Sequence, residues 1–202
     1  AGSYTLNVQA VAPVANPVSD TVPYGSSSNV VPLSFSGSTP TSVAIASPAS
    51  HGTATASGTT ITYTPISGYT GTDSFTYTGT NSAGTSAPAT VSITVSGPTL
   101  AITSSSGGTS LTAQVGQSFT QTFTFSGGAA PYSGYSILGL PAGLQSTGSS
   151  STSITVSGTP TVSGTFTLTV SGTDSSTGTD PSSGKNAPFT VNQTFSLVIS
   201  TA

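Results

Sequence analysis

The chain has 202 residues, of which only 2% are charged, whereas about one quarter is usual in soluble domains. With one Lys, no Arg and a net charge of −3, it lacks the basic surface that binding to nucleic-acid phosphates or anionic lipid headgroups requires. No apolar run approaches the roughly 20 residues of a membrane-spanning helix. Composition therefore excludes a nucleic-acid partner and membrane insertion by a helix.

The composition favours a folded all-β protein over a disordered one. Ser and Thr make up about two residues in five, which resembles a flexible linker. Hydrophobic residues nevertheless reach 33% and recur at alternate positions, the spacing of a strand with one buried face. Gly, Pro, Ser and Thr interrupt every window long enough for a helix.

Residues 1–12 do not belong to the pattern that follows them. Their sequence AGSYTLNV at 1–8 is similar to SGTFTLTV at 163–170, a predicted strand near the other end of the chain. We interpret residues 1–12 as the last strand of a preceding repeat, so that the chain is a piece of a longer array. The alternative is a donor strand that completes a sheet in another copy of the chain.

Residues 13–96 are predicted to form one β-sandwich. Alternating apolar residues mark strands whose inward faces are Leu33 and Phe35, Val43 and Ile45, Ile61 and Tyr63, Phe75 and Tyr77, and Val91, Ile93 and Val95. Thr and Ser occupy the positions between them and are expected on the solvent faces of antiparallel sheets.

Residues 97–202 are predicted to form a second β-sandwich, after a turn at Ser96, Gly97 and Pro98. Its inward faces are Leu100 and Ile102, Phe119, Phe123 and Phe125, Ile154 and Val156, Phe166, Leu168 and Val170, and Phe195, Leu197 and Ile199. About seven strands per domain, separated by Gly-rich turns, indicate two immunoglobulin-like (Ig-like) sandwiches in series.

Two sets of short motifs resemble known bacterial repeats. The blocks VGQSF (115–119), GGAAPY (127–132), GLPAGL (139–144) and SGTP (157–160) resemble an Ig-like repeat of long bacterial surface and secreted proteins. The blocks HGTAT (51–55), ITYTP (61–65) and GYTGTDSFTY (68–77) resemble the cadherin-like bacterial Ig repeat. The resemblance implies structural modules in a tandem extracellular protein, with neighbouring repeats as their partners.

Catalytic chemistry has few candidate residues. His51 is the only histidine, and a nucleophilic triad would need an acid to orient it, for which the first predicted domain offers only Asp20 and Asp73. We expect His51 to lie in a turn entering a strand and Asp73 to accept backbone N–H bonds within its own turn. The sequence predicts a non-catalytic protein without a cofactor.

Metal binding and covalent crosslinking are also disfavoured. Calcium needs six to eight oxygen ligands, usually from several carboxylates, whereas only Asp174 and Asp180 share a loop. We expect no metal site, with weak cation binding by that loop as an open alternative. Lys185 lies in a loop-like sequence, where a solvated side chain is expected rather than a bond to a core Asn.

Carbohydrate binding is the main alternative to a purely structural role. The residues that could present an exposed ring are Tyr132 and Tyr135, which follow a Gly-Gly turn, and Tyr24, which precedes Gly25. We therefore expect a structural spacer or stalk repeat of a bacterial extracellular adhesin or autotransporter-like protein. The alternatives are a filament subunit that assembles through residues 1–12 and a carbohydrate- or surface-binding module.

Overall fold

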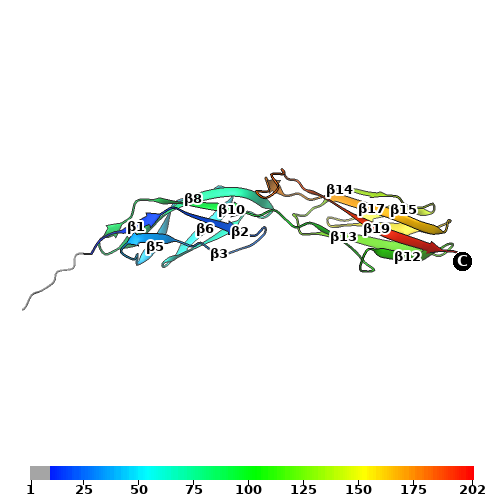
Figure 1. The fold of residues 1–202 in the computed structure, drawn as a ribbon, viewed down its shortest axis with the longest axis horizontal. Coiled ribbons are helices and arrows are strands. Elements are labelled where there is room, and N and C mark those ends of the chain that lie inside the picture. Colours follow the sequence, from blue (N-terminus) through cyan, green and yellow to red (C-terminus); the bar gives the residue numbers. More distant parts are fainter. Residues whose placement is uncertain (1–9) are drawn as a thin grey trace, which may run out of the picture. The chain divides into compact units, whose positions relative to one another are not determined.

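The computed structural model describes residues 10–202, which divide into two compact units (Figure 1). The first unit comprises the chain up to residue 97 together with residues 180–183, and the second comprises residues 98–179 and 184–202. Residues 1–9 lie outside the described part, so the role expected for residues 1–12 stays a prediction. Among residues 10–202, no helix is long and apolar enough to cross a membrane.

The first unit is built from two facing groups of strands. One sheet has the order β5-β8-β10-β2, with β9 also paired to β8; the other has the order β3-β7-β6, and β1 and β4 pair separately. The strands are β1 (Pro13–Asn16), β2 (Val18–Val22), β3 (Asn29–Val30), β4 (Ser34–Gly37), β5 (Ser42–Ser47), β6 (Gly52–Ser57), β7 (Thr60–Pro65), β8 (Tyr69–Asn81), β9 (Gly84–Thr85) and β10 (Ala89–Val95).

Alternating side chains from these sheets form the core of the first unit. The predicted inward residues of β7, β8 and β10 are all buried, as is Val43 of β5, while Leu33, Phe35 and Ile45 are partly buried against them. The Tyr77 hydroxyl lies 2.7 Å from the Ser34 carbonyl oxygen and 2.8 Å from the Asn16 carbonyl oxygen. This phenol therefore ties the β1–β4 ladder to the core through polar contacts that an apolar ring could not make.

In the first unit the second strand, β2, and the last strand, β10, run parallel. Pro17, which has no N–H to donate to a ladder, separates β1 from β2, and the chain changes partner there from β4 to β10. In the β2–β10 pair, Val18 lies opposite Val91 and Val22 lies opposite Val95. Alternation predicts which side chains face inward but not strand direction, so these parallel pairs were not expected from the sequence.

The second unit has two four-stranded sheets, with orders β11-β13-β16-β15 and β12-β19-β17-β14. Its second strand, β12, and its last strand, β19, again run parallel. The strands are β11 (Ala101–Ser104), β12 (Ser110–Gln114), β13 (Phe119–Ser126), β14 (Ser133–Leu138), β15 (Leu144–Ser149), β16 (Ser153–Gly158), β17 (Gly164–Thr173), β18 (Thr177–Gly178) and β19 (Thr190–Ser200).

The core of the second unit follows the predicted alternation. Of the predicted inward residues, only Leu100, Phe119 and Phe166 are partly rather than fully buried. Phe123 and Phe195 meet across the two sheets with ring centroids 4.7 Å apart. The all-β class with two Ig-like sandwiches is therefore confirmed, although each unit has more strands than the seven that were expected.

Two glycines of the GLPAGL and SGTP blocks face each other at a close backbone approach. Gly143 has φ +92° and Gly158 has φ +144°, conformations that residues with a side chain rarely adopt. A Cβ on Gly158 would lie 2.1 Å from the Gly143 carbonyl oxygen, which also accepts a hydrogen bond from Thr159 N–H at 3.0 Å. The physical reason for glycine in both blocks is therefore lack of space.

Gly158→Ala should lower the free energy of unfolding of the second unit by at least about 2 kcal/mol, because both the backbone angle and the contact disfavour a Cβ. Gly148→Ala is the matched control on the neighbouring strand, where a Cβ meets nothing within 4 Å, and should change it by less than about 0.5 kcal/mol. Chemical denaturation measures both. Equal effects of the two substitutions would contradict this explanation.

Candidate functional site

The first unit buries one carboxylate, that of Asp73 in β8, which is 8% exposed. Asp73 Oδ1 accepts the backbone N–H groups of Ser50 at 3.0 Å and Ser74 at 2.8 Å. Its Oδ2 accepts the His51 N–H at 2.9 Å and the Tyr63 hydroxyl at 2.7 Å. One side chain therefore joins β8 to the turn before β6 and to β7 of the opposite sheet.

These four hydrogen bonds keep the buried carboxylate charged. Burial alone would raise the pKa of Asp73, but the bonds from Tyr63, Ser50, Ser74 and His51 together outweigh burial, and the pKa falls below its usual value. Burial, followed by the bond to Asp73, raises the pKa of Tyr63 far above its usual value, so the phenol remains a donor. The sequence predicted backbone N–H bonds for Asp73, but most come from a turn over twenty residues away.

His51 lies in the turn before β6, as the sequence predicted, and its ring packs on Tyr69. The two rings are parallel, with an interplanar angle of 3° and centroids 4.2 Å apart. The Tyr69 hydroxyl donates to the Thr72 carbonyl oxygen at 2.7 Å, and this bond fixes the position of the Tyr69 ring. Asp73 thus contacts the backbone of His51 while the imidazole stacks on Tyr69, an arrangement unlike the imidazole–carboxylate bond of a catalytic triad.

A surface hollow of about 440 Å³ lies beside His51 and is the candidate functional site. Thr72 and Ser74 of β8 contribute to its lining, and they stand directly opposite Thr94 and Ser92 of β10. They alternate with buried residues, so all four side chains are on the outer face of the sheet. Sequence reasoning missed this hollow because it could not tell which residues of the two strands pair.

The three tyrosines predicted as ligand contacts lie elsewhere. Tyr132 is 4% exposed, its ring packs against Phe125 at 5.5 Å, and its hydroxyl accepts the Gly128 N–H at 2.9 Å. Tyr135 is half-buried against the same Phe125, and Tyr24 is half-buried in the turn after β2. Tyr132 therefore cannot offer a ring face to a sugar, since the Gly-Gly turn directs it into the core rather than outward.

The remaining carboxylates are engaged in bonds of their own. Asp174 is 2% exposed and accepts the Phe189 N–H at 2.8 Å, the Ala129 N–H at 3.3 Å and the Ser176 hydroxyl. Asp180 accepts N–H and hydroxyl groups of Ser182 and Ser183. Within residues 10–202, no three His, Cys, Asp or Glu side chains gather as metal ligands would.

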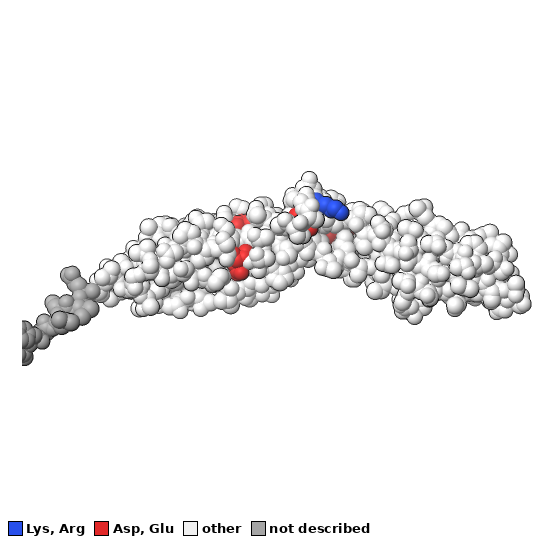
Figure 2. Space-filling view, in the orientation of Figure 1, with Lys and Arg blue, Asp and Glu red and all other residues white. Residues whose placement is uncertain are grey.

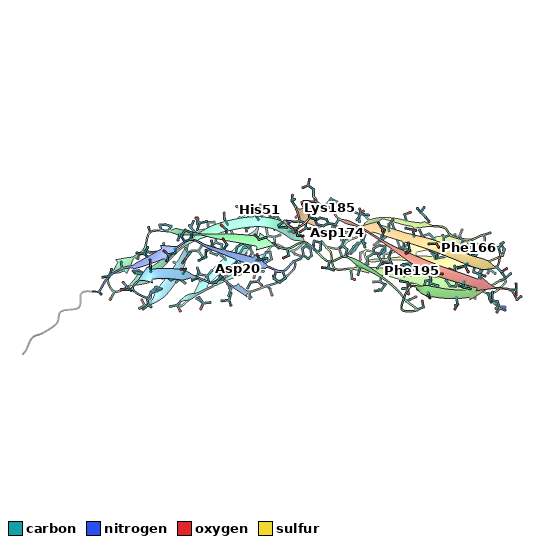
Figure 3. The ribbon with its side chains drawn as sticks, viewed as in Figure 1. Asp20, His51, Phe166, Asp174, Lys185 and Phe195 are labelled. Carbon is teal, nitrogen blue, oxygen red and sulfur yellow. The ribbon has the colours of Figure 1, made fainter. Side chains whose placement is uncertain are left out.

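Charged side chains are correspondingly rare on the surface. Figure 2 shows a face that is almost entirely uncharged, with a few acidic patches and one basic side chain. That basic residue, Lys185, is exposed and lies outside the strands. Figure 3 shows it in the segment that follows Asp174. Its position agrees with the loop expected from the sequence.

The family comparison concerns the first unit. Residues 10–94 match the family model described as a bacterial Ig domain. The matched residues form the sandwich that carries the hollow, while residues 95–202 lie outside the match. No curated protein matches the chain.

Solved structures with a similar arrangement have low sequence identity to the chain. The titin domains Z1Z2 in complex with telethonin are 14% identical over 96% of this chain and 100% of that chain, with a TM-score of 0.47. An endo-fucoidan hydrolase from glycoside hydrolase family 107 is 13% identical over 98% of this chain, with a TM-score of 0.43, and the chain spans only 30% of its length. Domains 4 and 5 of the S-layer protein SbsC are 16% identical over 69% of this chain and 62% of that chain, with a TM-score of 0.37.

Asp73→Asn should lower the free energy of unfolding of the first unit by about 2–4 kcal/mol, because an amide presents N–H donors where the carboxylate accepts from His51 and Tyr63. Asp20→Asn is the control: Asp20 is half-buried on β2 and accepts the adjacent Thr21 N–H at 2.8 Å, a local bond within one strand. It should change stability by less than about 0.5 kcal/mol. Thermal and urea unfolding measure both, and an Asp73→Asn protein as stable as Asp20→Asn would argue against the role given to Asp73.

The stability that Asp73 contributes should depend on pH in a defined direction. Its pKa is lower in the folded chain than in the unfolded chain, where it is about 3.9, so its contribution is complete above that value. It is lost as pH falls through the folded-state pKa. The stability difference between the wild type and Asp73→Asn should therefore narrow as pH falls below about 4, as measured by urea unfolding. A difference that stays constant with pH would show that the carboxylate charge is not its source.

Proposed function

We propose that the chain is a non-catalytic spacer or stalk segment of a bacterial extracellular adhesin or autotransporter-like surface protein. Its partners in this role are neighbouring Ig-like repeats of the same polypeptide. The bacterial Ig match at residues 10–94 supports an extracellular structural module, and the absence of a catalytic arrangement around His51 is consistent with it.

The path of the chain through each unit carries this proposal. In a parallel pair, both strands start at one end and finish at the other. The chain enters the first unit at β1 and continues through β2, which starts beside Val91 and finishes beside Val95, the last residue of β10. In the second unit, β12 and β19 are related in the same way, from Ser110 beside Ser196 to Gln114 beside Ser200. Each unit can therefore be joined to others at opposite ends.

The same pairing suits a segment under tension. When the ends of the first unit are pulled apart, β2 and β10 slide along each other, and the backbone hydrogen bonds between them share the load. Pulling at a hairpin would instead break bonds one after another. A surface with so few charges also makes this resistance insensitive to ionic strength, since screening acts on charged pairs.

The filament alternative depends on residues 1–12, most of which lie outside the described part of the chain. It makes a different prediction from the spacer in solution, since strand donation between copies produces concentration-dependent assemblies. Sedimentation of the full chain and of a chain lacking residues 1–12 separates the two roles: a spacer is monomeric in both forms.

Pulling experiments test the mechanical role, and the lack of native cysteine permits clean attachment through introduced pairs. Handles at positions 12 and 96 should give unfolding of the first unit at a clearly higher force than handles at positions 59 and 96, where the β6–β7 hairpin is peeled. Both should release length at roughly 3.6 Å per freed residue. Equal forces in the two geometries would remove the mechanical argument for a stalk.

A further inference from the structure

We propose that the hollow beside His51 is a binding site for neutral saccharide units. The inference does not depend on the spacer function, because it concerns one face of the first unit. The hollow is defined by the His51 turn on one side and by paired residues of β8 and β10. Its volume of about 440 Å³ falls within the range of small-ligand sites, ~300–1,000 Å³.

The first element of the site is a fixed aromatic surface. The His51 imidazole is exposed, and its ring is stacked on Tyr69 at 4.2 Å. The backbone beneath it is held by Asp73, which accepts both the Ser50 and the His51 N–H groups. Because ring and backbone are both held before a ligand arrives, binding costs little ordering of the protein. The C–H face of a pyranose is the group that stacks on such a flat surface.

The second element is a row of hydroxyls. Thr72 and Thr94 form one cross-strand pair and Ser74 and Ser92 form the next, all on the outer face beside the ring. Each hydroxyl can donate and accept a hydrogen bond, as each sugar hydroxyl does. The Cβ atoms within one cross-strand pair lie about 5 Å apart. The two pairs are two residues apart along the strands, about 6.6 Å, so the hydroxyls of one sugar unit can reach both pairs.

Charge decides the class of ligand. His51 and Asp73 are the only ionisable side chains that line the hollow. The Asp73 oxygens already accept four hydrogen bonds, so the carboxylate is not available to hold a cation or an amine. The lining has no Lys or Arg for a sulfate, phosphate or uronate. A neutral polyhydroxylated ligand is what remains.

Titration of the full chain with neutral oligosaccharides tests the site, with cellohexaose, mannohexaose and maltohexaose as probes. Two-dimensional NMR should show saturable amide shifts confined to Ser50–His51, Thr72–Ser74 and Ser92–Thr94 with at least one probe. Hexagalacturonate, the charged comparison, should give no tighter binding, and raising the salt concentration should not weaken the neutral complex.

Substitutions distinguish specific binding in the hollow from non-specific binding elsewhere on the surface. His51→Ala should weaken binding about tenfold, because it removes the stacking surface but leaves the backbone bond to Asp73. His51→Phe should retain binding within about threefold. Ser92→Val, which keeps a strand-forming side chain without a hydroxyl, should weaken binding about fivefold. Thr55→Val, on exposed β6 outside the hollow, is its matched control and should have no effect.

The proposal is overturned if none of the three neutral oligosaccharides shifts the amide signals of the hollow, or if the shifts lie on another surface. It is also overturned if His51→Ala has an unchanged melting temperature and binds the oligosaccharide as tightly as the wild type does. Shifts with an unrelated neutral peptide at equal strength would also overturn it in favour of a peptide site. None of these results would affect the spacer proposal, which the pulling experiment tests separately.

Discussion

The buried carboxylate of Asp73 is the contact on which the arrangement of the first unit depends. A charge in the interior is unfavourable unless it is paired or fully hydrogen-bonded, and here four donors meet it. Three of them come from elements remote in sequence, so the turn at Ser50–His51, strand β8 and the opposite sheet are positioned together. The orientation of the His51 ring and the outline of the hollow follow from that anchoring.

The second unit contains a comparable device at Asp174. Its carboxylate accepts N–H groups from the segment at Ala129 and from Phe189, which lies just beyond the end of the β17–β19 ladder. Two of the four acidic residues are thus placed in the interior of a chain that is almost free of charge. Both carboxylates hold loops in place through hydrogen bonds, a role for which some small secreted domains use disulfides.

The sequence predicted the inward faces of the sheets well, because burial and alternation are local properties. Phe75, Tyr77 and Leu168 are buried as expected. Parallel pairing and register could not be predicted, since a run such as Val18–Val22 reads the same for either strand direction. The break at Pro17 between β1 and β2 could not be predicted either, because it matters only once their different partners, β4 and β10, are known.

The candidate site was less accessible to sequence reasoning than the fold. His51 was correctly interpreted as a turn residue, but its stacking on Tyr69 depends on the path of the β5–β6 turn. Tyr132 follows two glycines and a proline, a pattern that suggests a surface position, yet its ring fills the core beside Phe125. Ser74 and Ser92 are ordinary residues in the sequence, and only the register of β8 and β10 makes them neighbours.

The parallel pairing of β2 with β10, and of β12 with β19, has a consequence for how the number of such domains in a polypeptide can change during evolution. Because a domain of this kind starts at one pole and finishes at the other, a duplicated gene segment can be inserted in frame without a reversal of the polypeptide at the new joint. Selection can therefore alter the number of copies while leaving every individual fold as it was.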